Sequence, residues 1–402
     1  MYRVTGKFVS LSAVSIAVCV LAAAAAPAQA GWSTPVHPSA ACTPASGLNI
    51  TRNTAGAWLL VGSFTQSDGS AAVESCTSSD GVSWSGPSMI GPGILPVVAV
   101  APNGRAVVAF SGLPPAAYNI QASVRPPGGN WSTPVAISTG TVSASALIKM
   151  DGSGNAIAIW PTGTASLAAN STTWTPVTTL AAKNGTQGLA VNSTGSVVIG
   201  YRNGSPDETR AVSGSILGGL GAPVSLGGNY GTAVRPVQVA LNDAGQAVLG
   251  WVTDDYCKVV TRTAGGTWSA PTQLDGINAE GVGVAIDAAG NAIAGYGDDE
   301  PDVHGVTAIY GTKMPAGGTW GTATLLSTLD AKGHVTVGGD AAGTFIVAWL
   351  DNAGNVEALT IPPGGAFGPG TVVGAGGITQ LIVIPGLAVL SIGAGISHQS
   401  IN

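Results

Sequence analysis

The chain has 402 residues, including 60 Gly and 25 Pro, and only 8% of its residues are charged. So few charges exclude a disordered chain kept open by charge repulsion, and a hydrophobic content of 45% is enough for a sizeable core. The formal net charge of −6 argues against nucleic acid and anionic membrane surfaces as partners.

The first thirty residues have the features of a secretory signal peptide. Arg3 and Lys7 supply a positive start, residues 8–26 form an apolar run, and the sequence AQA at residues 28–30 gives a small-x-small cleavage pattern. We therefore expect residues 1–30 to be removed and residues 31–402 to be secreted, either outside the cell or into the periplasm of a Gram-negative host.

Three cysteines follow the expected signal peptide. In an oxidising compartment Cys42 and Cys76 are the nearest pair and the candidate disulfide, provided that their geometry permits the bond. Cys257 is then an unpaired thiol, which we expect to be buried as a small hydrophobic side chain.

From residue 50 onward one segment recurs: a short apolar strand, an Asp/Asn-x-x-Gly turn, a second apolar strand and an aromatic residue. An Asp or Asn that opens the turn, and a Gly able to adopt a positive φ, are what a tight hairpin requires. The segment returns about every 47 residues, and residues 239–251 (VALNDAGQAVLGW) are one copy. The turn glycines are Gly56, Gly104, Gly154, Gly195, Gly245, Gly290, Gly343 and Gly386.

Each hairpin is followed by a third strand and by a fourth strand that starts with Gly-x-Trp-Ser/Thr-x-Pro or a related sequence. Four short strands in a period of roughly 40–50 residues are typical of a β-propeller blade. We find no sustained helical periodicity after the signal. The sequence thus predicts an all-β β-propeller of eight four-stranded blades, with seven as the alternative count. The signature aromatic residues are Trp84, Trp131, Trp174, Trp268, Trp320 and Phe367.

The two ends of the mature chain complement each other. The last hairpin, residues 380–392, is followed by ten residues, which suffice for a third strand but not for a fourth. The missing signature stands at residues 31–36 (GWSTPV), so we expect this N-terminal strand to close the last blade of a single propeller domain. The apolar stretch 376–396 has the length of a membrane span, but Pro385-Gly386 interrupts it, and we predict a hairpin instead.

Two segments, RPPGGNWSTPVAIS (125–138) and RTAGGTWSAPTQLDG (262–276), resemble the sialidase-like or BNR-like propeller repeats of bacterial secreted proteins. The resemblance extends over almost all of residues 31–402. Residues 78–84 (SSDGVSW) are also similar to the Asp-box of those repeats, with one residue fewer. The resemblance implies the propeller fold more than it implies the enzyme activity, because sialidases have six blades.

A site of the sialidase type needs three arginines around a substrate carboxylate, a Tyr–Glu nucleophile pair and an Asp acid/base. Arg202 and Arg235 are expected on one face with Tyr201 and Glu208, which is one arginine too few. We therefore assign no catalytic residues. The arginines of the mature chain are Arg52, Arg105, Arg125, Arg202, Arg210, Arg235 and Arg262.

The loops that follow the second strands in residues 188–328 carry the candidate ligand-binding residues. An aromatic residue six positions after the turn glycine ends these second strands, and it serves either packing between blades or stacking with sugar rings. Polar residues, which are scarce elsewhere, cluster in the loops that follow. The candidate ligand-binding residues are Tyr201, Arg202, Trp251, Asp254, Asp255, Tyr296, Asp298 and Asp299.

The acidic loop that begins at Asp298 is also a candidate calcium site. Asp298, Asp299, Glu300 and Asp302 offer the hard oxygen ligands that Ca²⁺ prefers. Their spacing matches no EF-hand, and a solvated loop is the alternative. No cofactor other than calcium is indicated.

These features favour a secreted, non-catalytic binding module that is a monomer, with carbohydrate or a cell-surface protein as its partner and carbohydrate as the better fit. One alternative is a sialidase-like glycoside hydrolase or lyase that uses carboxylates such as Asp254, Asp298 or Glu300. A second alternative is a structural or adhesive surface protein without a small ligand. The fold class alone does not decide between them.

Overall fold

The computed structural model describes residues 32–402 apart from short gaps, so the expected signal peptide, residues 1–30, lies outside the described residues. The gaps are residue 37 and residues 114–117, 143–144, 183–185, 205–206, 229–234, 254–255, 275–278, 300–306, 328–330, 385–386, 393–394 and 401–402.

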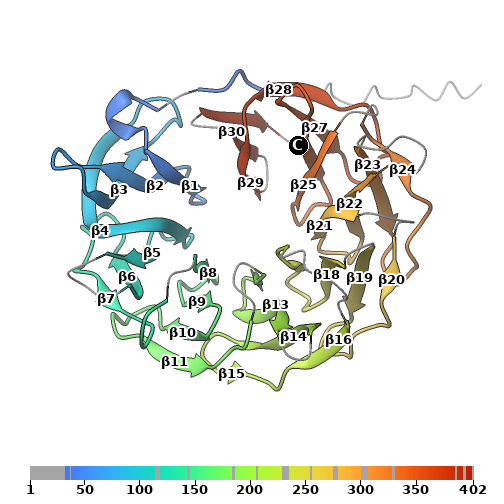
Figure 1. The fold of residues 1–402 in the computed structure, drawn as a ribbon, viewed down its shortest axis with the longest axis horizontal. Helices are drawn as coiled ribbons and strands as arrows, with labels where there is room; N and C mark the ends of the chain where they lie inside the picture. Colours follow the sequence, from blue (N-terminus) through green and yellow to red (C-terminus); the bar gives the residue numbers. More distant parts are fainter. Residues whose placement is uncertain are drawn as a thin grey trace, which may run out of the picture.

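Antiparallel strands make up almost all of the regular structure of the described residues, together with one short 3-10 helix, η1 (Ala40–Cys42). The sheets follow one another around a ring with an open centre (Figure 1). Within a sheet the chain passes from an inner strand near the centre to outer strands at the rim. The structure therefore confirms the expected all-β, propeller-like architecture.

The first two meanders share one long strand. The first contains β1 (Ser46–Arg52), β2 (Trp58–Thr65), β3 (Ala71–Ser78) and the first part of β4 (Ser85–Val100). The second contains the rest of β4, β5 (Ala106–Gly112), β6 (Ile120–Arg125) and β7 (Val135–Ala136).

Further meanders follow in chain order. The next contains β8 (Leu147–Met150), β9 (Ala156–Trp160), β10 (Gly163–Leu167) and β11 (Thr175–Thr178). After it come β12 (Gly188–Val191), β13 (Ser196–Gly204), β14 (Asp207–Ser215), β15 (Gly219–Leu220) and β16 (Val224–Gly228). These are followed by β17 (Gln238–Leu241), β18 (Ala247–Val252), β19 (Cys257–Arg262) and β20 (Thr272–Gln273).

The last third of the chain completes the ring. It starts with β21 (Ala279–Ile286), β22 (Ala292–Asp299), β23 (Thr307–Met314) and β24 (Thr324–Leu325). It continues with β25 (Ala331–Gly339), β26 (Phe345–Asp351), β27 (Asn355–Ile361) and β28 (Thr371–Ala375). It ends with β29 (Ile378–Ile384), β30 (Leu387–Ile392) and β31 (Gly395–Ser400). The pairing of β29 with β30 confirms the predicted hairpin. Among the described residues, no helix is both long and apolar enough to cross a membrane.

The repeated Asp/Asn-x-x-Gly turns fold as the sequence predicts. In the β8–β9 turn the Asp151 carboxylate accepts hydrogen bonds from the backbone N–H of Asn155 (2.8 Å) and from its side-chain Nδ2 (2.6 Å). Gly154 adopts a φ of 90°, in the region that favours glycine. Asp287 and Asn291 form the same pair of bonds in the β21–β22 turn. Local side-chain bonds therefore hold these turns and support the register of the flanking strands.

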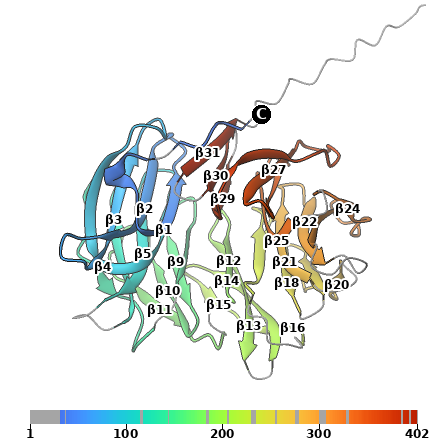
Figure 2. The same ribbon diagram turned by 45° about the horizontal axis from the view of Figure 1, so that its top comes forward.

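The N-terminal segment joins the last sheet (Figure 2). The backbone N–H and C=O of Val36 bond to the C=O and N–H of Ile396 in β31, both at 2.8 Å. Trp32 packs against the buried cluster that contains Val356 and Leu390. The two ends of the described chain thus meet in one sheet, as expected from the sequence.

The hydrophobic core lies between neighbouring sheets rather than at the centre of the ring. Val107 of β5 and Ile148 of β8 belong to one buried cluster, and Val259 of β19 and Val284 of β21 belong to another. Burial of apolar surface therefore holds each of these sheets against the next. The inner strands are left to face an open channel.

Candidate functional site

The aromatic residues predicted to bind ligand are buried between sheets. Tyr201, Trp251 and Tyr296 are each 2% exposed. The Tyr296 hydroxyl donates a hydrogen bond to the Leu274 carbonyl (2.7 Å), and its ring stacks on Tyr310. This placement corrects the expectation of an open stacking surface, because side chains buried so deeply present no face to a sugar ring. Their position fits the alternative role, packing between blades.

Arg202, the basic residue predicted for the same site, is engaged by an acidic neighbour. Its side chain is buried, and its Nε and Nη2 donate to the two carboxylate oxygens of Asp207, both at 2.7 Å. On the neighbouring strand β14, Arg210 pairs with Glu208, and the Ser225 hydroxyl donates to Glu208 Oε2 (2.5 Å). The hydrogen bonds from Ser225 and Arg210 hold the pKa of Glu208 below its usual range. The charges of this hairpin thus stabilise one another.

Most of the predicted acidic residues lie outside the described part of the chain. This holds for Asp254, Asp255, Glu300 and Asp302. Asp298 is half-buried near the end of β22, and the same strand contains Asp299. Among the described residues, no group of three or more His, Cys, Asp or Glu side chains could hold a metal ion. Calcium binding by the acidic loop therefore stays a prediction.

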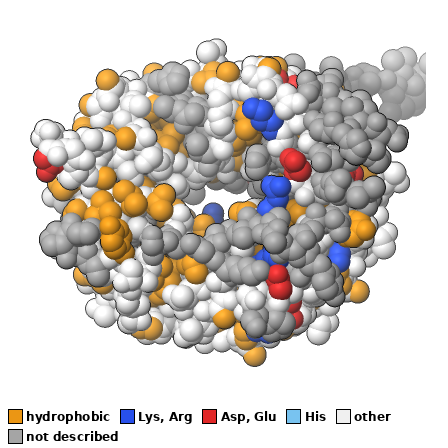
Figure 3. Space-filling model, in the orientation of Figure 1, with side chains coloured by type: hydrophobic (Ala, Val, Ile, Leu, Met, Phe, Trp, Pro, Cys, Tyr) orange, Lys and Arg blue, Asp and Glu red, His pale blue; other side chains and the backbone are white. Residues whose placement is uncertain are grey.

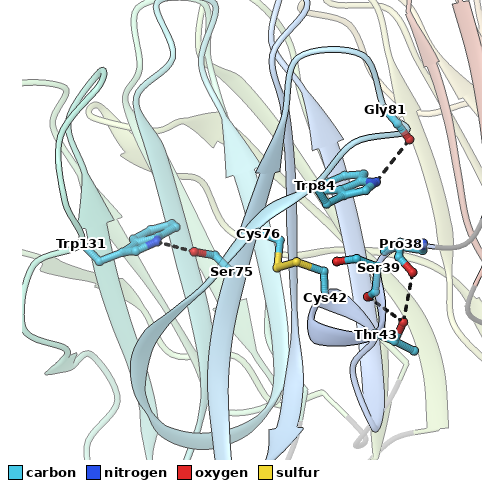
Figure 4. The surroundings of a disulfide bond; sticks show 9 residues. All are labelled: Pro38, Ser39, Cys42, Thr43, Ser75, Cys76, Gly81, Trp84 and Trp131. Atoms are coloured by element: carbon cyan, nitrogen blue, oxygen red, sulfur yellow. Dashed lines mark hydrogen bonds between the residues drawn. A yellow bond between two sulfur atoms is a disulfide. The ribbon is translucent and has the colours of Figure 1, made fainter.

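Cys42 and Cys76 form the expected disulfide, which ties the segment around η1 to β3 (Figure 4). Cys257 is a buried thiol that takes part in no disulfide among the described residues, also as expected. Beside the disulfide, Ser75 of β3 faces the second meander, and its hydroxyl accepts a hydrogen bond from Trp131 Nε1 (2.9 Å). This bond links the first two meanders at their outer side.

A polar depression lies at this junction, and we call it the outer depression. Its volume of about 480 Å³ is in the range of small-molecule sites, roughly 300–1,000 Å³. Strands β3 and β4 supply one wall, and the end of β6 with the turn that follows it supplies the other. Its lining residues are Ser75, Thr77, Ser85, Gly86, Ser88, Met89, Arg125, Gly129, Asn130 and Trp131.

Arg125 is the charged residue of the outer depression. Its guanidinium lies over the Trp131 ring, 5.2 Å from the ring centroid, in a cation–π contact. No described residue accepts a hydrogen bond from this guanidinium, and its Nε is buried. Burial lowers the pKa of Arg125, but arginine stays charged at neutral pH. Because the described lining contains no Asp or Glu, the depression offers a partly desolvated cation without an acidic partner.

The β3–β4 turn, which joins two strands of the outer depression, is held by a side-chain network. Asp80 Oδ1 accepts hydrogen bonds from the backbone N–H groups of Ser83 (2.7 Å) and Val82 (2.8 Å) and from Ser78 Oγ (2.8 Å). These bonds, with that from Ser83 first, keep the pKa of Asp80 well below its usual range. The sequence that resembles an Asp-box therefore forms a turn that fixes β3 against β4.

The outer depression is built from residues that the sequence assigns to other roles. Trp131 belongs to the fourth-strand signature, and Arg125, one of the seven arginines of the mature chain, is not among the candidate ligand-binding residues that the sequence indicates. The sequence contains one pattern that could indicate this site: Arg125 stands six residues before Trp131. The same spacing joins Arg262 to Trp268, where Arg262 Nη1 donates to a backbone carbonyl at 3.4 Å. Spacing alone therefore does not find the site.

Comparison with known proteins places the fold. Neither a family model nor a curated protein matches the chain. The solved structure of the BP39L lectin from Burkholderia pseudomallei matches with a TM-score of 0.55 and 12% identity, over 82% of this chain and 99% of that chain. Polysaccharide lyase Uly1 matches with a TM-score of 0.47 and 12% identity, over 93% and 97%. The lectin of Aleuria aurantia matches with a TM-score of 0.39 and 12% identity, over 83% and 97%. The likeness to BP39L shows a shared fold and no more.

Proposed function

We propose that the protein is a secreted, non-catalytic carbohydrate-binding module that takes acidic sugar chains in the outer depression. The observation that carries the proposal is the guanidinium of Arg125, stacked on Trp131 in a cavity lined by hydroxyl groups. A planar guanidinium binds a carboxylate or a sulfate through parallel N–H donors. The partly desolvated charge of Arg125 strengthens such a pair, because less water competes for it.

The remaining lining of the outer depression favours a sugar over an apolar ligand. Ser75, Thr77, Ser85 and Ser88 offer hydroxyl groups that both donate and accept hydrogen bonds, and Asn130 adds an amide. The indole of Trp131 supplies an apolar surface beside the cation. Glycoside hydrolysis normally uses a pair of carboxylates, and the described lining contains none. Binding without catalysis is therefore the function that this cavity supports best.

We further infer that the ring consists of eight four-stranded blades of the sialidase-like or BNR-like repeat type. The hydrogen-bonded turn at Asp80 supports the repeat type, because it gives the Asp-box-like sequence a structural role. The bond between Val36 and Ile396 supports a last blade that is completed by the N-terminus. The blades start at β1, within β4, and at β8, β12, β17, β21, β25 and β29.

Removal of the closing strand tests this architecture. A variant that lacks residues 32–36 loses its pairing with β31 and the packing of Trp32, so its melting temperature should fall sharply below that of the complete mature chain. Thermal unfolding followed by circular dichroism measures the difference. An unchanged melting temperature would contradict closure by this segment.

The binding proposal is tested with purified residues 31–402 on an array of neutral and acidic glycans and cell-wall polysaccharides. We expect selective binding of acidic glycans that Trp131→Ala abolishes. Trp268→Ala is the matched control, because Trp268 has the same place in another repeat and does not line the outer depression. Melting temperatures show whether both variants fold, and Arg125→Ala tests the same site with less effect on packing.

The outcomes of this experiment separate the alternatives. Binding that survives both Arg125→Ala and Trp131→Ala would place the ligand elsewhere. An array without any bound glycan would favour the structural or adhesive protein. A parallel array with EDTA in place of calcium tests the acidic loop that begins at Asp298, since loss of binding only with EDTA would support a calcium site there.

A further inference from the structure

The open centre of the ring is a second cavity, with a volume of about 400 Å³. Figure 3 shows that the ring is hollowed at its centre on the face in view. Residues of the inner strands β8, β12, β17, β21, β25 and β29 line this channel. Apart from Lys149 and Gln380, the lining side chains are small or aliphatic, and yet the exposed lining is more polar than apolar. The polar surface therefore comes largely from the backbones of the inner strands.

These backbones are exposed because the inner strands use only their outer edges for pairing. Strands β8, β12, β17, β21 and β29 are end strands of their sheets, and each pairs with the next strand outward. The opposite edge of such a strand presents N–H and C=O groups that the sheet does not use. On the unpaired edge of β1, for example, the backbone N–H of Ile50 donates a hydrogen bond to Gln380 Oε1 (2.8 Å). Backbone donors at the edge of a sheet can also bind an anion.

Lys149 of β8 is the charged residue in the described lining of this channel. Solvent reaches its side chain, although protein surrounds it closely enough to lower its pKa by desolvation. No described residue forms a hydrogen bond or an ion pair with its ammonium group, and the described lining contains no Asp or Glu. An anion beside the ammonium group would offset the cost of its desolvation. The channel thus contains a cation to which the described part of the chain supplies no partner.

Gln380 adds a second donor to the same cavity. Because its Oε1 accepts the N–H of Ile50, its Nε2 group is left to donate, and no described residue accepts a hydrogen bond from it. The ammonium group, this amide and the strand-edge N–H groups are all donors, so they suit a ligand with several acceptor oxygens around a negative charge. The strand-edge C=O groups accept hydrogen bonds, so hydroxyl groups of a ligand also find partners.

We propose that the channel binds a small phosphate ester of a polyol. Its phosphate pairs with Lys149, because lysine binds phosphate as a compact point charge with three rotatable donors, whereas a planar carboxylate is matched best by the fork of an arginine. Its hydroxyl groups bond to the polar edges of the inner strands. A neutral polyol leaves the ammonium group unpaired, and an anion without hydroxyl groups leaves the strand-edge C=O groups without donors, so a ligand with both parts fits best. The volume of the channel is again within the range of small-molecule sites, roughly 300–1,000 Å³.

This site is independent of the proposed carbohydrate site. The channel and the outer depression share no lining residue, and they lie at the centre and at the rim of the ring. Glycan binding at Arg125 and phosphate binding at Lys149 can therefore succeed or fail separately.

Isothermal titration calorimetry of residues 31–402 with glycerol 3-phosphate, inorganic phosphate and glycerol tests the proposal. We expect saturable binding of glycerol 3-phosphate, about fivefold weaker binding of inorganic phosphate because hydrogen bonds from the hydroxyl groups are lost, and no saturable binding of glycerol. Lys149→Met should weaken the binding of glycerol 3-phosphate at least about tenfold. Lys258→Met is the matched control, because Lys258 lies in β19 and does not line the channel; it should leave the affinity unchanged.

Three results would overturn the proposal. The first is the absence of saturable glycerol 3-phosphate binding, or binding that Lys149→Met leaves unchanged in a variant with a normal melting temperature. The second is binding of glycerol as tightly as glycerol 3-phosphate, because the charge of Lys149 is then irrelevant; this result is obtained with the unmodified chain and does not depend on whether a variant folds. The third is binding that Arg125→Met abolishes and Lys149→Met does not, which would place the phosphate in the outer depression.

Discussion

In the β13–β14 hairpin, Arg202 is buried and donates to both oxygens of Asp207, whereas between the first two meanders Arg125 lies over Trp131 with no acidic residue beside it. The first guanidinium is held within one hairpin by a neighbour five residues away along the chain. The second lies at a boundary where one meander supplies the cation and the other supplies hydroxyl groups.

This difference separates two uses of the same side chain. A bidentate ion pair satisfies the donors of Arg202 and contributes to stability, so a ligand would have to compete with Asp207 for them. Arg125 has its donors available, and the indole beneath it holds it in place. Availability of donors, rather than the presence of an arginine in a loop-rich region, marks the candidate site.

The largest effect should come from removal of Arg202. Arg202→Met removes the two hydrogen bonds to the partly exposed Asp207 carboxylate, and the loss of such charge-assisted bonds costs about 2 kcal/mol of the free energy of unfolding. Arg125→Met removes a cation–π contact, which costs about 1 kcal/mol or less. Urea unfolding followed by tryptophan fluorescence measures both. Equal losses in the two variants would show that the two arginines do not differ in this way.

The next effect is on ligand binding, where the order of the two arginines is reversed: a change of Arg125 should matter more than a change of Arg202. Arg125→Lys keeps the charge but loses the planar fork of donors, so the affinity for an acidic glycan should fall about tenfold. Arg202→Lys should leave that affinity unchanged because Arg202 does not line the outer depression. Binding should also weaken as ionic strength rises, since the contact is electrostatic. A titration in which Arg125→Lys binds as tightly as the unmodified chain would contradict the bidentate contact.

The smallest effect concerns the turn that joins β3 to β4. The folded state holds the pKa of Asp80 well below its ordinary value of 3.8, chiefly through the Ser83 and Val82 backbone N–H groups. The stability that Asp80 contributes is therefore complete above about pH 5 and is lost as the pH falls below the ordinary pKa. Asp80→Asn should have a lower melting temperature than the unmodified chain at neutral pH, and the difference should shrink toward about pH 3. A difference that stays constant with pH would exclude the carboxylate as its source.

Much of the fold could be predicted from the sequence because its repeating unit is local. The turn between Asp151 and Asn155 is held by bonds that span four residues, so the same pattern identifies the other hairpins. The closing contact between Val36 and Ile396 could also be predicted, since a strand signature was missing at one end and present at the other. The pairing of Cys42 with Cys76 followed from the expected compartment.

The candidate site could be predicted only in part, and the reason is burial. Tyr201, Trp251 and Tyr296 lie in the second strands β13, β18 and β22, and a sequence does not reveal whether such a ring faces solvent or the next sheet. Here the neighbouring sheets cover all three. Conversely, Trp131 belongs to the fourth-strand signature of its repeat, and its Nε1 donates a hydrogen bond to Ser75 of the preceding meander. Because the outer depression lies between these two meanders, Trp131 also lines it.

Short-range chemistry in the chain sets the hairpins, the strand order and the meeting of the two ends, because each of these rests on turn residues or on a repeated strand pattern. Long-range packing between strands decides which polar side chains remain available to a ligand. Arg202 meets Asp207 across one hairpin and is satisfied. Arg125 instead faces a space shared with the preceding meander, and Lys149 faces a space enclosed by strands from other sheets. The shape of that space depends on how the sheets fit together around the ring, and no local pattern encodes it.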